Sequence, residues 1–286
     1  MASQTGMIRS RLIVLVLFLA RIVLSSEIVA RAESVPVRHL EGVTFGFLTL
    51  RNTDGEIIAN GYLQQTAKPG TAIVTDDLQF HFKDGSLYRE ITKFTQRGTF
   101  QLVSDQVIQK GPAFKQESES WIDVASGKVT ISTMDKGKEK RTTKQMSLPP
   151  DVANGLLFIL AKNMDPSGAE TTVSMVAASD KPRVAKLKFT PAEEKPVKFG
   201  LLTFKAQHYV MKVQIEGVAG KVAPLVGKQP PDSQFWTIKS EAPTFVEFEG
   251  QMFEDGPVWR IEFAAPELEA GKGSAAEQTP DNKKSQ

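Results

Sequence analysis

The chain of 286 residues contains no cysteine. This absence excludes disulfide bonds, thiolate metal sites and cysteine nucleophiles together. The fold must therefore be held together by its apolar core alone, and a chain of this length can bury a core that is large enough.

Long apolar runs are also scarce, and the one near the N-terminus is short. Residues 12–20 are all apolar; Arg9 and Arg11 precede them, and Arg21 and an Ala-Arg-Ala motif at 30–32 follow. A basic stretch, an apolar stretch and small residues two positions apart are typical of a secretory signal. A membrane anchor is disfavoured, because a spanning helix needs roughly 20 apolar residues and Arg21 would be costly inside a bilayer.

We therefore predict a Sec-type signal peptide (1–32) that is cleaved after Ala32, which makes the protein periplasmic or secreted and leaves no transmembrane segment. Whether Met1 or Met7 is the true start stays open. The signal contains four of the 35 basic residues and one of the 33 acidic residues, so 31 basic and 32 acidic residues remain. A neutral chain predicts no binding to nucleic acid. The most basic stretch, 134–144, could touch an anionic envelope surface, but it also fits a charged hairpin that protects a sheet edge.

Motifs that carry chemistry are missing as well. The three histidines, His39, His81 and His208, are far apart in the sequence and form no closely spaced ligand pair. Nucleophile-elbow, phosphate-loop and dinucleotide fingerprints are absent, so we predict no catalytic residue, no metal site and no cofactor. Glu117 and Glu119 would share one face of a strand, a geometry that glycosidases use. With His81, they are the candidates for a hydrolase with an unrecognised site.

Strand and turn patterns dominate the rest of the chain. Turn residues recur every 10 to 15 residues from 41 to 146, and strand patterns return after residue 170. The Asp84-Gly85 pair predicts a hairpin with a two-residue turn. One segment has helical spacing: Pro149-Pro150-Asp151 is typical of a helix start, and apolar residues follow almost all the way round. We predict one apolar helix at about 150–163.

The expected fold is mainly β: a large curved antiparallel sheet or open half-barrel with this one helix. A single β-rich domain is predicted over 33–266, and a disordered tail over 267–286, where no apolar pattern remains. Phenylalanine occurs 17 times, whereas tyrosine and tryptophan occur 3 times each. Such a composition favours an apolar core or a lipid-type cavity over a sugar-binding platform.

Two short segments carry a resemblance. Ser147-Leu148-Pro149-Pro150-Asp151-Val152 is followed by the apolar residues 156–160, and the last strand is Pro257-Val258-Trp259-Arg260-Ile261-Glu262. In this order, over about 40–264, the chain resembles exported bacterial β-proteins of unknown function that have a long antiparallel meander and a Leu-Pro-Pro helix. These are distantly similar to periplasmic lipoprotein carriers. The resemblance implies a curved sheet around an apolar cavity and a lipid-type ligand, and it implies no catalytic residues.

The leading hypothesis is therefore an exported, non-enzymatic protein that binds an apolar ligand or acyl chain inside the curved sheet, with the helix as plug or lid. The residues expected to face inward and line the ligand site are Phe45, Phe47, Phe80, Phe82, Trp121, Leu156, Phe158 and Ile159. Each of them could equally be ordinary core. An envelope module that binds another protein, with a solid interior and an exposed apolar patch, is the alternative.

Overall fold

The computed structural model describes residues 34–135, 137–165, 167–168, 170–199, 202–214, 229–241 and 243–264. The predicted signal peptide (1–32) and the predicted tail (267–286) lie outside the described residues. Within them the chain forms fourteen strands and one helix, which confirms the predicted mainly β fold with a single helix. The strands are β1 (Thr44–Arg51), β2 (Ile57–Ala67), β3 (Ile73–Phe82), β4 (Leu87–Arg97), β5 (Thr99–Lys110), β6 (Ser118–Asp123), β7 (Lys128–Asp135), β8 (Lys138–Gln145), β9 (Thr171–Ala177), β10 (Arg183–Phe199), β11 (Leu202–Gln214), β12 (Ser233–Ile238), β13 (Thr244–Gln251) and β14 (Val258–Phe263).

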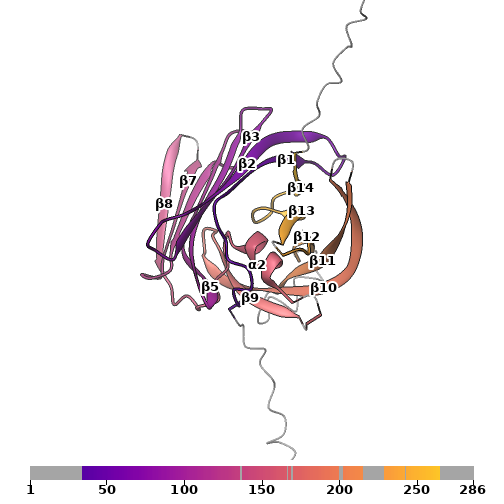
Figure 1. The fold of residues 1–286 in the computed structure, drawn as a ribbon. Coiled ribbons are helices and arrows are strands. Elements are labelled where there is room, and N and C mark those ends of the chain that lie inside the picture. Colours follow the sequence, from indigo (N-terminus) through magenta and orange to yellow (C-terminus); the bar gives the residue numbers. More distant parts are fainter. Residues whose placement is uncertain are drawn as a thin grey trace, which may run out of the picture.

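All fourteen strands belong to one antiparallel sheet, in the order β8-β7-β6-β5-β4-β3-β2-β1-β14-β13-β12-β11-β10-β9. The chain thus forms two meanders, an N-terminal one (β1–β8) and a C-terminal one (β9–β14), which join where β1 pairs with β14. The sheet curls round the helix α2 (Figure 1). It does not close, because no ladder joins β8 to β9 in the described chain. The predicted curved antiparallel sheet is confirmed.

The hairpin predicted at Asp84-Gly85 is present between β3 and β4, but its turn is longer than expected. Residues 83–86 connect the strands, and Gly85 has a positive φ of 86°. Its N–H donates to the carbonyl of Phe82, and the Phe82 N–H donates to the carbonyl of Ser86. Glycine tolerates this left-handed backbone without the steric cost that a side chain would bring.

The two edge strands of the sheet, β8 and β9, are protected in different ways. The segment 151–154 covers the outer edge of β9: the Ala153 N–H donates to the Ser174 carbonyl (2.8 Å), and the Asn154 amide bonds both backbone groups of Val176 (2.8 and 2.9 Å). Strand β8 is exposed along its length, and its lysines reach across to the β9–β10 turn. Lys140 pairs with Asp180 at 3.0 Å. A covered edge and a charged edge both prevent pairing with other chains.

The helix α2 (Leu157–Asn163) is shorter than the predicted 150–163. Two features delay its start. The backbone of Asp151 and Ala153 is already paired with Ser174 of β9, and Gly155 has a positive φ of 67°, which no α-helix contains. The residues from 150 to 156 therefore form two turns and a short parallel bridge to Ser174, and the apolar helical surface begins at Leu156.

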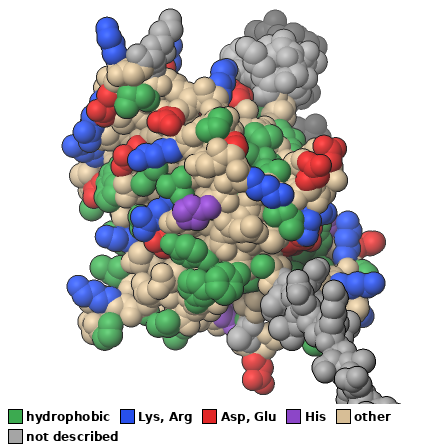
Figure 2. Space-filling model, turned by 90° about the horizontal axis from the view of Figure 1, so that it is seen from above, with side chains coloured by type: hydrophobic (Ala, Val, Ile, Leu, Met, Phe, Trp, Pro, Cys, Tyr) green, Lys and Arg blue, Asp and Glu red, His purple; other side chains and the backbone are tan. Residues whose placement is uncertain are grey.

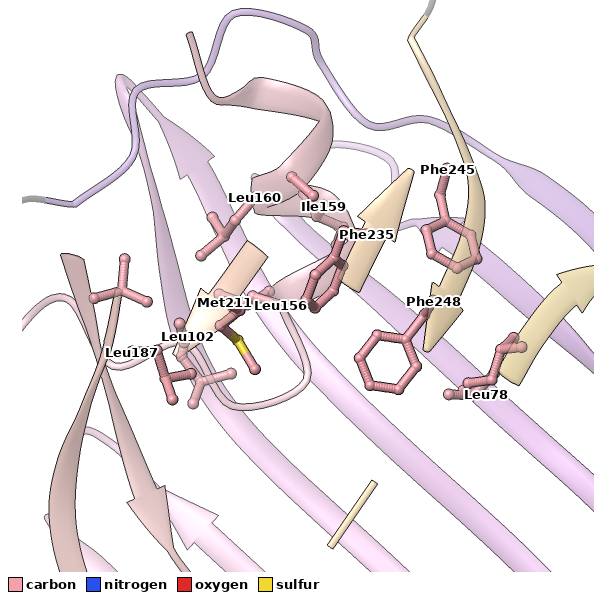
Figure 3. Packing of buried hydrophobic residues seen from close by; sticks show 14 of the residues in the cluster. Leu78, Leu102, Leu156, Ile159, Leu160, Leu187, Met211, Phe235, Phe245 and Phe248 are labelled. Carbon is pink, nitrogen blue, oxygen red and sulfur yellow. The ribbon is translucent and has the colours of Figure 1, made fainter. Parts of the chain in front are cut away.

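The apolar face of α2 packs on β12 and β13. Phe158 stacks on Phe245 with ring centroids 4.3 Å apart, and Phe235 and Phe248 lie within 6.1 Å of it. Figure 3 shows Leu156 and Ile159 beside these rings. Such aromatic pairs add to the free energy gained from burial.

The segment before β1 (residues 34–43) crosses the end of the sheet at which α2 lies, and it is bonded to the helix. The side-chain oxygen of Asn163 accepts the backbone N–H groups of Arg38 (3.0 Å) and His39 (2.8 Å). Lys162 forms an ion pair with Glu41 at 2.7 Å. We call this the plugged end of the sheet, because α2 and residues 34–43 fill it.

Candidate functional site

A cavity of about 800 Å³ lies inside the curl of the sheet. Its walls come from β3–β7 on one side and from β9–β11 and β13 on the other, and Leu157 and Phe158 of α2 border it at the plugged end. At the opposite end it is bordered by loop residues: Lys115 and Gln116 before β6, Asp180 before β10 and Glu254 before β14. We call this opposite side the open end.

The wall from the C-terminal meander is mostly apolar. Neighbouring strands place Met175, Ala185, Leu187, Met211 and Val213 against the cavity, and Phe248 of β13 continues this surface. Figure 3 shows Leu187, Met211 and Phe248 on this side of the interior. A surface of this kind favours hydrocarbon, because most of it forms no hydrogen bonds. Its polar residues include Gln214, Ser233 and Gln251.

The wall from the N-terminal meander carries polar groups, and the strand register orders them in rows. The row nearest the open end consists of Tyr88, Gln109, Ser118 and Thr133, which are successive partners across β4, β5, β6 and β7. Every member of this row has a polar group. Ser118 donates to the side-chain oxygen of Gln109 at 3.0 Å.

The second row is mixed, with Glu90, Val107, Ser120 and Ile131 as successive partners. The third row begins with Thr92 and Asp105, and it ends with the apolar residues of β6 and β7. Polarity on this wall therefore decreases from the open end towards the plugged end.

Two carboxyl groups stand on this wall. The Glu90 side chain accepts a hydrogen bond from the Tyr88 hydroxyl (3.2 Å), and Asp105 accepts one from the Thr92 hydroxyl (2.9 Å). Burial raises the pKa of Glu90, and the nearby charge of Asp105 raises it further. Burial also raises the pKa of Asp105, against the hydrogen bond from Thr92, which lowers it. Glu90 keeps some accessible surface because it faces the cavity rather than packed side chains. Both groups hold protons at a higher pH than ordinary carboxyls.

A third buried acid lies deeper, outside the cavity lining. Asp76 accepts a hydrogen bond from the Gln65 amide at 2.7 Å. Burial raises its pKa to about 7, although Gln65 and the charge of Lys162 act in the opposite direction. Its position near the Lys162–Glu41 pair makes it part of the plugged end.

Charged side chains flank the open end. Arg183 at the start of β10 pairs with Glu254 of the β13–β14 turn at 2.7 Å, and both side chains are about half exposed.

Acidic and basic side chains are interspersed over the face seen in Figure 2. No single sign of charge marks that face.

Five of the predicted lining residues are inside the protein, but only one of them borders the cavity. Phe158 lines it. The other four are packed in the core at 7 % exposure or less: Phe80, Phe82, Leu156 and Ile159.

The expectation that Phe45, Phe47 and Trp121 face inward is wrong. They are 54 %, 65 % and 38 % exposed. In β1 the inward side chains are Leu48 and Leu50, which are fully buried. Both faces of this strand are apolar, so alternation alone could not decide which face is covered.

Sequence reasoning missed the polar row and most of the apolar wall. The spacing of Ser118, Ser120 and Ile122 was a usable pattern, because alternate residues of a strand share one face. The pattern identifies one face of the strand, but it does not show that this face lines a cavity, since small polar residues on one face normally indicate that the face is exposed to solvent.

The candidates for a hydrolytic site are not brought together. His81 lies on β3 and is exposed beside Gln79, whereas Glu119 lies on β6 and bonds Gln106. Strands β4 and β5 separate them in the sheet. Glu117 instead accepts the Gly111 N–H at 3.0 Å, which fixes the β5–β6 loop.

Among the described residues, no group of three or more His, Asp and Glu side chains is placed to hold a metal ion. In the same part of the chain, no helix has the length and apolar character needed to cross a membrane. The fold and the cavity together define a hollow, curled antiparallel sheet with one inner helix. The chain matches no protein-family model, and no curated protein or solved structure matches it.

Proposed function

We propose that this protein binds an apolar or amphipathic small molecule inside the curled sheet. The observation that carries the proposal is the cavity of about 800 Å³, one wall of which is mostly hydrocarbon. Ligand pockets in proteins are mostly apolar and enclose roughly 300–1,000 Å³. Each Å² of apolar ligand surface removed from water contributes about 25 cal/mol.

An exported protein that carries such a ligand through the periplasm is the biological setting we propose. The signal-like N-terminal sequence supports export, and the carrier resemblance supports a lipid-type ligand. No chemical step is part of this proposal, because its ligand is bound and released unchanged.

The test compares two tryptophan substitutions on one strand. Val107 lies on the cavity wall, and its neighbour Ile108 lies on the outer face of β5. Val107→Trp fills the cavity, whereas Ile108→Trp adds the same bulk outside it. We expect palmitate to raise the melting temperature of the native protein and of Ile108→Trp, and not of Val107→Trp.

Native mass spectrometry of protein purified from its own envelope gives the second measurement. A co-purifying small molecule that is lost in Val107→Trp and kept in Ile108→Trp supports the proposal. A ligand-free mass, together with unchanged melting temperatures on addition of palmitate or phospholipid, overturns it.

A second candidate function is binding of another envelope protein. It is favoured by an exposed apolar patch at the start of β1, where Phe45 stacks on Tyr62 and packs edge-on against Phe47. Leu40 and Val43 beside it are 77 % and 79 % exposed. This function predicts that Phe45→Ser with Phe47→Ser abolishes cross-linking to a partner in intact envelopes and leaves palmitate binding unchanged. Equal cross-linking by the variant would reject it.

A further inference from the structure

The two walls of the cavity differ in chemistry. On the N-terminal side, Gln109 lies in the row nearest the open end, and Glu90 and Ser120 lie in the second, mixed row. The C-terminal wall presents mainly hydrocarbon, such as Met175 and Val213, and Ser233 is among its few polar residues. The difference lies across the cavity, in addition to the gradient along it.

Several groups of the polar wall have hydrogen-bonding capacity to spare. The Tyr88 hydroxyl bonds one oxygen of Glu90, and Ser118 bonds the side-chain oxygen of Gln109, so the other Glu90 oxygen and the Gln109 amide nitrogen keep no such partner among the described residues. The hydroxyls of Ser120 and Thr133 also have no protein partner within the described chain. None of these atoms is sealed from the cavity. The wall therefore offers both donors and acceptors to a ligand.

A straight hydrocarbon chain such as that of palmitate matches only the apolar wall of this arrangement. It would satisfy the apolar wall, but it would press methylene groups against hydroxyl, amide and carboxyl groups and leave those groups without hydrogen-bond partners. A head-to-tail amphiphile would match the gradient along the cavity, but it would leave Glu90 and Ser120 in the second row against hydrocarbon. Neither shape matches a polar surface that runs along one side of the space.

We infer that the cavity selects a rigid, facially amphipathic molecule, with hydroxyl or amide groups on one face and hydrocarbon on the other, such as a polyhydroxylated polycyclic compound. The polar face lies against β4–β7 and the hydrocarbon face against β9–β11. This inference rests on the proposed function, since it specifies the ligand of the same cavity.

Cholate and lithocholate provide a matched pair of probes. They share the ring system and the carboxylate, but cholate carries additional hydroxyls, all on one face, and lithocholate is the more hydrophobic of the two. We expect isothermal titration calorimetry to show cholate binding about tenfold more tightly than lithocholate, because each well-placed hydrogen bond offsets lost hydrophobicity. An affinity order that follows hydrophobicity overturns the inference.

Variants of the polar wall identify the cause. Thr133→Val combined with Ser120→Ala removes two hydroxyls with little change in shape. Ser132→Ala removes one hydroxyl from the outer face of β7 and serves as the control. The double variant should lose about tenfold in cholate affinity and keep its lithocholate affinity, whereas the control should change neither.

The outcomes separate the two proposals. If palmitate binds and is excluded by Val107→Trp while cholate does not bind, the proposed function stands and the facial specificity is wrong. If the double variant binds cholate as tightly as the native protein does, the polar wall does not select the ligand. If cholate, lithocholate and palmitate all fail to bind, both proposals fail.

Discussion

At the plugged end of the sheet Phe158, Phe235 and Phe248 pack ring against ring, whereas the open end of the same sheet encloses a cavity of about 800 Å³. The plugged end also has buried hydrogen bonds, such as those at Asn163, and the open end has exposed ion pairs, such as Arg183–Glu254. One curled sheet thus combines a tightly packed end with a hollow end. Burial at one end stabilises the fold, so the other end is free to stay hollow.

The largest expected effect concerns the aromatic cluster. Phe235 is fully buried and contacts Phe158, Phe189 and Phe248. Phe235→Ala should lower the free energy of unfolding by about 3–5 kcal/mol, measured by urea denaturation. Phe253→Ala, at the half-buried rim of the cavity, should cost less than about 2 kcal/mol. Equal losses would remove the distinction between the two ends.

The next effect concerns Asn163, which is completely buried. Asn163→Ala leaves the N–H groups of Arg38 and His39 without their acceptor, so the free energy of unfolding should fall by about 2–3 kcal/mol. Hydrogen exchange at these two amides should accelerate at the same time. The exposed Asn60 provides the control, and Asn60→Ala should change stability by less than about 0.5 kcal/mol. Unchanged exchange in Asn163→Ala would show that residues 34–43 are held by other contacts.

A smaller effect should appear on changing pH. Burial raises the pKa of Glu90 to about 8 and that of Asp105 to about 7, so the native state keeps protons that the unfolded chain releases from about pH 4 upward. This contribution to stability is complete below about pH 4, and it is lost as the pH rises from there through the raised pKa values of the two groups. Burial also raises the pKa of Asp76, so this group too makes the protein less stable as the pH rises. Burial lowers the pKa of His208, which has the opposite effect on stability.

We therefore expect a lower melting temperature at about pH 9 than at about pH 5, by roughly 2–4 °C for each kcal/mol lost. Glu90→Gln should flatten this dependence, because an amide cannot titrate. A steeper pH dependence of the melting temperature in Glu90→Gln, or a melting temperature of the native protein that rises towards pH 9, would contradict the assignment of this pH dependence to the carboxyl groups of the cavity wall.

The smallest effect is expected at the open end. Arg183→Ala should change the free energy of unfolding by less than about 1 kcal/mol, because half-exposed ion pairs contribute little. A double-mutant cycle with Glu254→Ala measures the coupling, and added salt should weaken it. A coupling above about 2 kcal/mol would mean that the open end is fastened as firmly as the plugged end.

Local patterns predicted the elements well. Turn residues and alternation located the strands, and the run from Leu156 to Ala161 located the helix, because these properties depend on neighbours in the sequence. The start of the helix was predicted too early. Pro149-Pro150 is compatible with a helix start, but the backbone that follows pairs with Ser174 on a later strand.

The candidate site was predicted only in part. Phe158 was expected and lines the cavity, but Phe45 and Phe47 lie on the outside. The polar row could not be predicted, since Tyr88 and Thr133 become neighbours of one wall only through three successive strand pairings. Each pairing has its own register, and a shift by one residue moves every side chain to the other face.

The sequence by itself determined that this protein is mainly β, has an apolar helix after residue 156 and folds without disulfides, because composition and short-range periodicity suffice for these properties. The tertiary structure decided which face of each strand is inside and that the interior is hollow at one end. A period of two fixes only that side chains alternate. The choice between faces follows from the curl of the sheet and from the pairing of β1 with β14, which joins the two ends of the described chain.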